Sequence, residues 1–220
     1  MKLPFEKIYC LHLVEASERY TNVLKECARI NLENEVNFWY TSKKPINAII
    51  GNHIETLHDG YYDRNFRINP YTYGACFDCA YNHYSIIKQA YIRGINTILI
   101  FEDDICFNYD VNLLNNIIDN IPNDYDVLKF YNTCYNKQNN IDNGYFEIIN
   151  EQNTKLYYHS TLCYALSRKG MEALINEYEK NLLAADVALN NIKSNNDIKY
   201  YTLKLNVFCI PREFVSTIVE

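Results

Sequence analysis

Three consecutive carboxylates, Glu102, Asp103 and Asp104, directly follow an apolar run at residues 97–101. The run has the length and the isoleucine-rich composition of a buried strand, and Gly94 precedes it as a turn residue. Adjacent carboxylates repel one another unless water solvates them or a divalent cation lies among them, and Mg²⁺ and Mn²⁺ prefer such oxygen ligands. Ligands of open α/β sheets bind beyond the carboxyl ends of the strands. The stretch therefore predicts either a metal site or a solvated turn, and these residues alone leave both interpretations open.

A second group with metal-binding potential is the Cys-x-x-Cys pair of Cys76 and Cys79. A structural zinc site needs a second pair of ligands, and no partner pair is evident, so the sequence disfavours zinc at this pair. Most of the eight cysteines lie in apolar runs, as small buried side chains do. Because the start of the chain lacks the pattern of a signal peptide, we expect reduced thiols and a cytoplasmic protein.

The composition is that of a folded protein. The 220 residues carry a formal net charge of −6 and no block of Lys or Arg, which argues against nucleic acid as the main partner. No stretch is long enough and apolar enough to span a membrane. The length, with no linker and no internal repeat, predicts a single domain over residues 1–220.

Alternating strand and helix patterns predict an α/β fold in which a sheet positions the acids. Residues 7–13 and 36–41 have strand composition and flank a helical pattern that begins near Ser17, which forms a β-α-β opening. A second helix is expected over residues 75–93 and should end at Gly94. Further helices are expected at residues 111–121, 168–178 and 181–192, and further strands at residues 126–131, 145–149, 156–166, 199–203 and 206–210.

Several motifs occur along the chain in a fixed order: a strand end followed by Arg at residues 11–19, the Cys-x-x-x-His of Cys79 and His83, the Glu-Asp-Asp at residues 102–104, a Tyr-x-x-Ser-Arg-x-Gly at residues 164–170, and Asp186. In this order and spacing the chain resembles the family 25 glycosyltransferases, which include lipopolysaccharide β-galactosyltransferases and collagen galactosyltransferase domains. It departs from the family pattern at His12, Asp78 and Asn82, where the family has Asn, Gly and Ser.

The resemblance implies a GT-A-type glycosyltransferase fold, with a single nucleotide-binding mixed sheet flanked by helices. It implies a UDP-sugar donor, usually UDP-galactose, with Mn²⁺ or Mg²⁺ as cofactor, and a glycan or glycoprotein acceptor such as a lipopolysaccharide. By the same resemblance Asp104 is the principal metal ligand, and Glu102 and Asp103 bind the metal or the donor. A cation there would hold a diphosphate that three carboxylates would otherwise repel, and would stabilise UDP as it leaves.

The remaining candidate residues also follow from the resemblance. The β-linked products of the family imply inversion, which requires a general base, and Asp186 is the candidate. Arg19, His83 and His159 are expected to contact the donor, Arg19 at the uracil or a phosphate and His159 at the diphosphate. Each of these four residues also has a purely structural interpretation. Asp186 could be an ordinary acid near a helix start, and Arg19 a solvated charge on a helix. His83 could be a hydrogen-bonded core histidine, and His159 a strand residue that faces solvent.

Other functions remain open at this point. The acids would also serve a Mg²⁺-dependent phosphoesterase or nucleotidyltransferase. The first strand does not end in the Asp-x-Asp of an aspartyl phosphoesterase, and residues 14–19 lack the glycines of a nucleotidyltransferase loop, which counts against both. The third hypothesis is a relative that binds a nucleotide sugar but does not catalyse transfer. It stays open because Asp78 and Asn82 replace the Gly and Ser that the family pattern has near His83.

Overall fold

A computed structural model describes residues 3–41, 70–107, 111–131, 144–149, 160–180, 183–195, 197–204 and 208–209, with the side chains of 70–77 and 208–209 left undescribed. In these residues a seven-stranded mixed sheet forms the centre of the molecule. The predicted α/β class, with a mixed sheet flanked by helices, is confirmed. The prediction that residues 1–220 form one domain stays a prediction.

The main sheet combines parallel and antiparallel strands. Its strands are, in spatial order, β2 (Val36–Thr41), β1 (Lys7–Leu13), β3 (Thr97–Glu102), β7 (Cys163–Ser167), β5 (Val127–Lys129), β8 (Tyr200–Leu203) and β6 (Phe146–Ile148). The helices are α1 (Ser17–Arg29), α3 (Pro70–Ile92), α4 (Val111–Asp119), α5 (Arg168–Lys180) and α6 (Ala185–Lys193). Strand β1 pairs in parallel with β2 and β3, whereas β7 runs antiparallel to β3 and β5.

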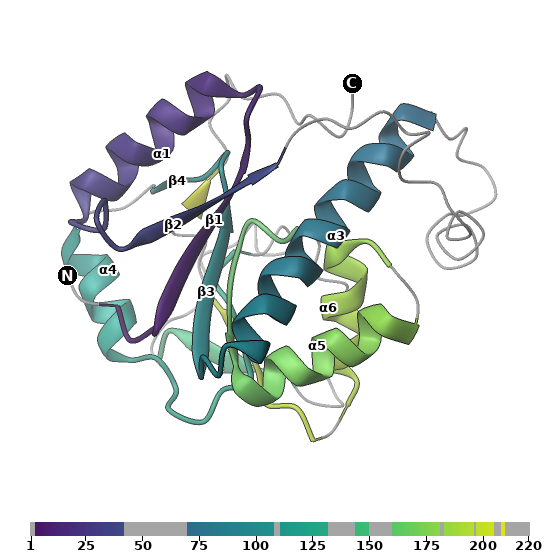
Figure 1. The fold of residues 1–220 in the computed structure, drawn as a ribbon. Helices are drawn as coiled ribbons and strands as arrows, with labels where there is room; N and C mark the ends of the chain where they lie inside the picture. The colour runs from purple at the N-terminus through teal and green to yellow at the C-terminus, as the bar shows by residue number, and fades with distance from the viewer. Residues whose placement is uncertain are drawn as a thin grey trace.

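Helices cover both faces of this sheet, as Figure 1 shows, with α1 and α4 on one side and α3, α5 and α6 on the other. Each face has its own apolar core. The central strand β3 alternates between them: Ile98 and Ile100 pack toward α3 and α5, and Leu99 and Phe101 pack toward α1 and α4. This period of two is the signature of a strand buried on both faces, so the apolar run is the strand that the sequence predicts.

Two glycines fix how helices meet the sheet. Gly94 adopts a φ of 76° directly after α3, a left-handed conformation that favours glycine and that ends the helix where the sequence predicts. Gly170 lies in the first turn of α5, where a Cβ atom would collide with the backbone carbonyl of Asp126. The glycine therefore allows α5 to approach β5 closely.

The topology brings several chain segments to the carboxyl end of β3. Because β1 and β3 are parallel, with Leu11 opposite Glu102, both strands end at the same edge of the sheet. Strand β7 begins at this edge, with Cys163 opposite Phe101, and the Glu102 amide donates a 3.0 Å hydrogen bond to the Leu162 carbonyl. Helix α1 begins four residues after β1 ends, so its first turns also face the three acids.

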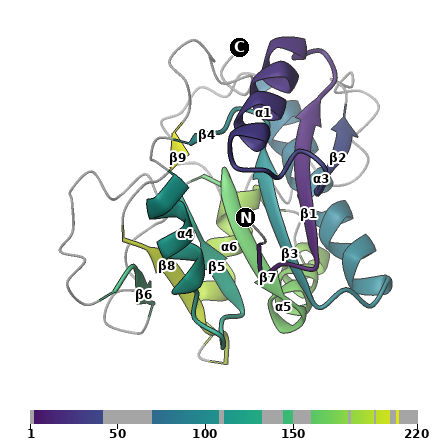
Figure 2. The same ribbon diagram turned by 90° about the vertical axis from the view of Figure 1, so that its left-hand side faces the viewer.

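Four sequence predictions need correction. The strand expected at residues 206–210 is β9 (Phe208–Cys209), and it does not extend the main sheet. It pairs instead with β4 (Cys106–Phe107), a strand that the sequence did not predict, and Figure 2 shows this small sheet beside α1. Helix α3 begins at Pro70, five residues earlier than expected. Cys106 is disulfide-bonded, so the expectation of reduced thiols is wrong for this residue, whereas the following form no disulfide: Cys10, Cys27, Cys79 and Cys163.

Of the helices in the described part of the chain, none has the length and apolar character needed to cross a membrane.

Candidate functional site

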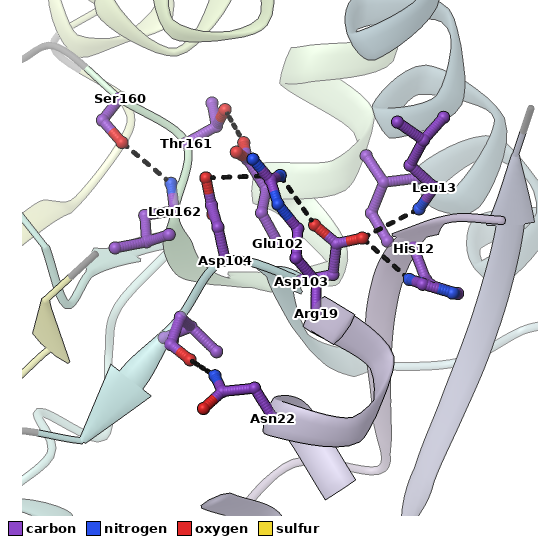
Figure 3. Close-up of polar contacts among 12 residues, drawn as sticks. His12, Leu13, Arg19, Asn22, Glu102, Asp103, Asp104, Ser160, Thr161 and Leu162 are labelled. Carbon is purple, nitrogen blue, oxygen red and sulfur yellow. Dashed lines mark hydrogen bonds and ion pairs between the residues drawn. The ribbon is translucent and has the colours of Figure 1, made fainter. Parts of the chain in front are cut away.

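Asp103 is the acid of the cluster that makes the most contacts with neighbouring elements. It is 4% exposed, and both of its carboxylate oxygens accept hydrogen bonds. Oδ2 accepts from the Leu13 amide at 2.9 Å and lies 2.7 Å from Nδ1 of His12, while Oδ1 accepts from the Arg19 guanidinium at 3.2 Å. These partners come from β1 and α1, so Asp103 ties three elements together (Figure 3).

Arg19 balances part of the charge of the cluster. Its side chain is 10% exposed, and the Nη1 atom that contacts Asp103 also lies 3.7 Å from Oδ2 of Asp104. A buried guanidinium between two carboxylates offsets part of their mutual repulsion. The sequence prediction placed Arg19 near the donor, and the structure brings it directly to the acids.

Asp104 is the acid with an unsatisfied atom. The residue is 8% exposed, and its Oδ1 atom has no hydrogen-bond partner within the described residues. Burial raises the pKa of Asp104 to about 7, and the charges of Glu102 and Asp103 add to this shift, whereas Arg19 opposes it. A buried carboxylate oxygen without a partner is costly, and a bound cation removes this cost.

Glu102 faces the other side of the sheet edge. The Thr161 hydroxyl donates a hydrogen bond to Oε1 of Glu102, and Nε2 of His83 lies 3.4 Å from the same oxygen. Burial alone would raise the pKa of Glu102, but His83, Thr161 and Arg19 together hold the pKa of this carboxyl below its ordinary value. Glu102 is therefore an ionised carboxylate whose orientation is set from two sides.

His83 lies behind Glu102 rather than in an open pocket. It is completely buried, and its Nδ1 atom lies 2.7 Å from the hydroxyl of Tyr164, which is also completely buried. The sequence left open whether His83 packs behind the metal strand or points into the donor site, and its burial favours the first. A role for His83 in donor binding is then indirect, through the position of Glu102.

Two side-chain hydrogen bonds fix the backbone near the acids, one just after Asp104 and one at the turn before β7 (Figure 3). The Asn22 side chain on α1 donates a 3.0 Å hydrogen bond to the carbonyl of Ile105, just after the acids. Ser160 adopts a φ of 73°, which is uncommon for a residue other than glycine. Its hydroxyl accepts a 3.1 Å hydrogen bond from the Leu162 amide, which fixes the turn that presents Thr161 to Glu102.

Two of the predicted site residues remain, His159 and Asp186. His159 lies outside the described residues. Asp186 lies in the first turn of α6, and its backbone carbonyl accepts a 2.7 Å hydrogen bond from the side-chain amide of Asn190. Burial raises the pKa of the Tyr178 phenol well above its usual range, and the charges of Cys79, Asp186 and Glu102 add to this effect. Asp186 is thus on the α3 and α5 side of the sheet, where Tyr178 lies.

Sequence reasoning missed three residues that the structure places around the acids: His12, Thr161 and Tyr164. His12 was noted only as a departure from the family pattern, yet it is 3% exposed and contacts Asp103. Thr161 lies within the strand expected at residues 156–166, and its place beside Glu102 depends on the pairing of this strand with β3. Nothing in the local sequence marks the contact between His83 and Tyr164, which are 81 residues apart.

The comparisons with known proteins concern nearly the whole chain. The family model described as "Glycosyltransferase family 25 (LPS biosynthesis protein)" matches residues 5–189. No curated protein matches the chain.

Three solved structures illustrate how distant the structural relatives are. A glycosyltransferase involved in the glycosylation of the major capsid of PBCV-1 is 12% identical, with a TM-score of 0.37, and the match covers 86% of this chain and 67% of that one. The glycosyltransferase GlyE of Streptococcus pneumoniae TIGR4 is 11% identical, with a TM-score of 0.45, over 90% of this chain and 45% of that one. Mouse xyloside xylosyltransferase 1 is 9% identical, with a TM-score of 0.37, over 88% and 83%. The chain therefore spans less than half the length of the streptococcal protein.

Proposed function

Since the chain belongs to glycosyltransferase family 25 and is a glycosyltransferase, we propose that it transfers galactose from UDP-galactose to a hydroxyl of a glycan or glycoprotein acceptor, with Mn²⁺ or Mg²⁺ as cofactor. The observation that carries this proposal is the buried Oδ1 atom of Asp104, which has no hydrogen-bond partner in the described part of the chain. It lies at the carboxyl end of β3, where α/β sheets bind their ligands. With this function we propose that the fold is of the GT-A type.

The side chains at this edge fit a hard divalent cation. Glu102, Asp103 and Asp104 supply oxygen donors, and Arg19 offsets only part of their negative charge. We assign Asp104 as the principal ligand and Glu102 as the second, because both oxygens of Asp103 already accept hydrogen bonds from the protein. When bound, a cation here would neutralise the diphosphate of the donor and, as a Lewis acid, favour the departure of UDP.

The protein itself supplies rigidity at the same edge. Asp103 joins the end of β1 to α1 through three donors, and this arrangement fixes the backbone that precedes Asp104. The Arg19 guanidinium contacts both aspartates, so it limits the repulsion between the acids. A site that holds its ligands in position before the substrate binds loses little free energy to reorganisation.

Asp186 is our proposed general base for an inverting reaction. A single displacement at the sugar needs a base on the side opposite the leaving group, which takes the proton of the acceptor hydroxyl. Asp186 is half-buried at the start of α6, and it belongs to the same side of the sheet as His83, the partner of Glu102. The anomeric configuration of the product, determined by NMR, tests this part of the proposal: an α-linked product would contradict inversion.

The experiment that tests the proposed function combines binding with turnover. Thermal unfolding of the protein is followed with UDP, with Mn²⁺ and with both, and UDP release from UDP-galactose is measured with a panel of glycan acceptors. We expect stabilisation by UDP that requires Mn²⁺, and release of UDP that requires an acceptor. The absence of any stabilisation by UDP with Mn²⁺ would refute the proposal.

The competing functions give different results in the same assays. A nucleotide-sugar-binding relative without catalysis would be stabilised by UDP and Mn²⁺ but would release no UDP with any acceptor. A phosphoesterase would hydrolyse phosphate esters with Mg²⁺ and without an acceptor sugar. UDP-glucose in place of UDP-galactose tests the sugar, because a few side chains that contact one hydroxyl group decide this preference.

A further inference from the structure

A second set of ligand atoms lies beside the acidic cluster, on the α3 side of the sheet. The thiol of Cys79, the imidazole of His83 and the carboxylate of Glu102 each offer one ligand atom, and these atoms all lie within 4.8 Å of one another. We infer that the three residues form a site for a divalent cation that prefers thiolate, such as Zn²⁺, and that an ion bound there withdraws Glu102 from the site at Asp104.

The secondary structure presents these ligands from two elements. Cys79 and His83 are four residues apart on α3, a spacing that places two side chains on the same face of a helix, one turn apart. Glu102 ends β3, which packs beneath that helix. Two ligands from one helix turn and a third from a neighbouring element form a common arrangement for metal sites.

The histidine shows the strongest sign that a cation belongs here. His83 is fully buried, and its Nε2 atom has no hydrogen-bond partner in the described part of the chain. Its Nδ1 atom lies 2.7 Å from the Tyr164 hydroxyl. If Nδ1 carries the proton and donates to Tyr164, then Nε2 directs a lone pair toward Oε1 of Glu102, 3.4 Å away. Two acceptors that face each other in a buried position repel one another unless a proton or a metal ion lies between them, and a metal ion would satisfy both.

Tyr164 then acts as the outer partner of the ligand. Histidines that bind metals usually donate their other ring N–H to an oxygen, which fixes both the tautomer and the ring orientation. The Tyr164 hydroxyl is placed for this role, and the ring of Tyr164 packs against His83 with centroids 5.6 Å apart.

The donor set differs in kind from that at Asp104. Sulfur, nitrogen and one carboxylate oxygen suit Zn²⁺, whereas Mg²⁺ and Mn²⁺ prefer oxygen alone. Three protein ligands leave a fourth tetrahedral position for water. The Cys79 thiol loses its proton to solvent when the metal binds, so the affinity rises with pH. An ion can enter beside Glu102, whose side chain is 23% exposed.

The regulatory part of this inference rests on the proposed function. Glu102 is shared by both sites, since the carboxylate assigned as the second ligand at the catalytic cation also faces His83. An ion on Cys79 and His83 would pull this carboxylate toward α3. We therefore expect Zn²⁺ to weaken the combined binding of Mn²⁺ and UDP.

Cobalt substitution tests the site without reference to glycosyl transfer. The full chain is freed of metal with a chelator, the chelator is removed, and Co²⁺ is added. We expect one equivalent of Co²⁺ to produce a thiolate-to-cobalt charge-transfer band and the visible bands of a tetrahedral ion, and one equivalent of Zn²⁺ to abolish them. Without a charge-transfer band the inference fails, and His83 is instead protonated at Nε2 and bonded to Glu102.

Matched variants identify the ligands. Cys79→Ser should remove the charge-transfer band, whereas Cys27→Ala, which changes a buried thiol on the opposite face of the sheet, should keep it. A band that persists in Cys79→Ser would overturn the assignment. Tyr164→Phe conserves the shape of the core residue and should weaken Co²⁺ binding about tenfold, as the loss of an outer partner does. An unchanged Co²⁺ affinity in Tyr164→Phe would refute the proposed role of this hydroxyl.

A final measurement separates this inference from the proposed function. Stabilisation by UDP with Mn²⁺ is recorded with increasing Zn²⁺ in the native chain and in Cys79→Ser. We expect Zn²⁺ to reduce the stabilisation in the native chain only. Equal reduction in both proteins would refute the regulatory part of the inference. If the native chain shows the cobalt charge-transfer band but is not stabilised by UDP with Mn²⁺, the proposed function is refuted and the thiolate site is retained.

Discussion

The two sides of the acidic edge differ in how completely their polar groups are satisfied. On the β1 and α1 side, Asp103 accepts hydrogen bonds from His12, the Leu13 amide and Arg19. On the side of α3, Nε2 of His83 lacks a hydrogen-bond partner in the described part of the chain, and so does Oδ1 of Asp104, whose other oxygen lies 3.7 Å from Arg19. The first side has the character of a folded core, and the second has that of a binding site whose ligand completes it.

This difference suggests a division of labour between neighbouring residues of the same type. Asp103 and Asp104 are adjacent in sequence. Both oxygens of Asp103 accept hydrogen bonds from the protein, whereas Oδ1 of Asp104 has no hydrogen-bond partner in the described part of the chain. Variants at the two positions should therefore fail in different ways. Asp103 variants should lose stability, and Asp104 variants should lose function while they keep or gain stability.

The largest effect is expected for Asp104→Asn. The amide keeps the shape of the side chain but removes the charge that we assign to cation binding, so UDP release with acceptor should fall by about 10²–10³-fold. Steady-state UDP release measures it. Asp119→Asn, which changes an exposed acid at the end of α4, is the control and should keep the native rate. A variant Asp104→Asn with native activity would remove this residue from the mechanism.

Asp103→Ala should mainly lower stability. Removal of the carboxylate leaves the buried Arg19 guanidinium without its 3.2 Å partner, a change that typically costs about 3–5 kcal/mol. Urea unfolding followed by circular dichroism measures the loss. As a control, Asp124→Ala breaks an exposed ion pair with Lys199 and should leave the free energy of unfolding nearly unchanged. Equal effects at the two positions would contradict the scaffold role of Asp103.

The pH dependence of stability should carry the signature of Asp104. Because burial raises its folded-state pKa to about 7, the folded protein retains a proton that the unfolded chain has lost between roughly pH 4 and 7. The stabilising contribution of this group is therefore complete below pH 4 and is lost as the pH rises toward 7. Without metal, the free energy of unfolding should fall by about 2–4 kcal/mol across this range relative to Asp104→Asn. Parallel pH profiles for the native chain and the variant would contradict the raised pKa.

The smallest effect is expected for Thr161→Val, which removes the hydroxyl that donates to Glu102 and keeps the side-chain shape. The loss of one hydrogen bond to a charged group costs about 1.5–3 kcal/mol at most, and part of it should appear as a several-fold lower rate of UDP release. Thr21→Val, which removes an exposed hydroxyl on α1, is the control. If Thr161→Val has no effect on activity, the orientation of Glu102 from the β7 side is not important for catalysis.

The sequence predicted the parts of the site that are local. Three of these parts were recognisable: the apolar run before the acids, the helix that precedes it, and Gly94 between them. Each depends on a local feature of the sequence, namely hydrophobic periodicity, residue composition or a glycine that ends a helix. The partners of the acids were not recognisable. His12 and Asp103 are 91 residues apart, and they meet only because β1 and β3 pair in parallel with one register. The short strands β4 and β9 were missed or misplaced for the same reason, since each is defined by its partner rather than by its own composition.

The central claim is that Asp104, and not its neighbour Asp103, holds a divalent cation. Electron paramagnetic resonance measures it most directly, because the signal of free Mn²⁺ falls as the ion binds protein in the presence of UDP. We predict that the native chain binds Mn²⁺, that Asp119→Asn binds it equally well, and that Asp104→Asn does not bind it. Undiminished Mn²⁺ binding by Asp104→Asn would contradict the account.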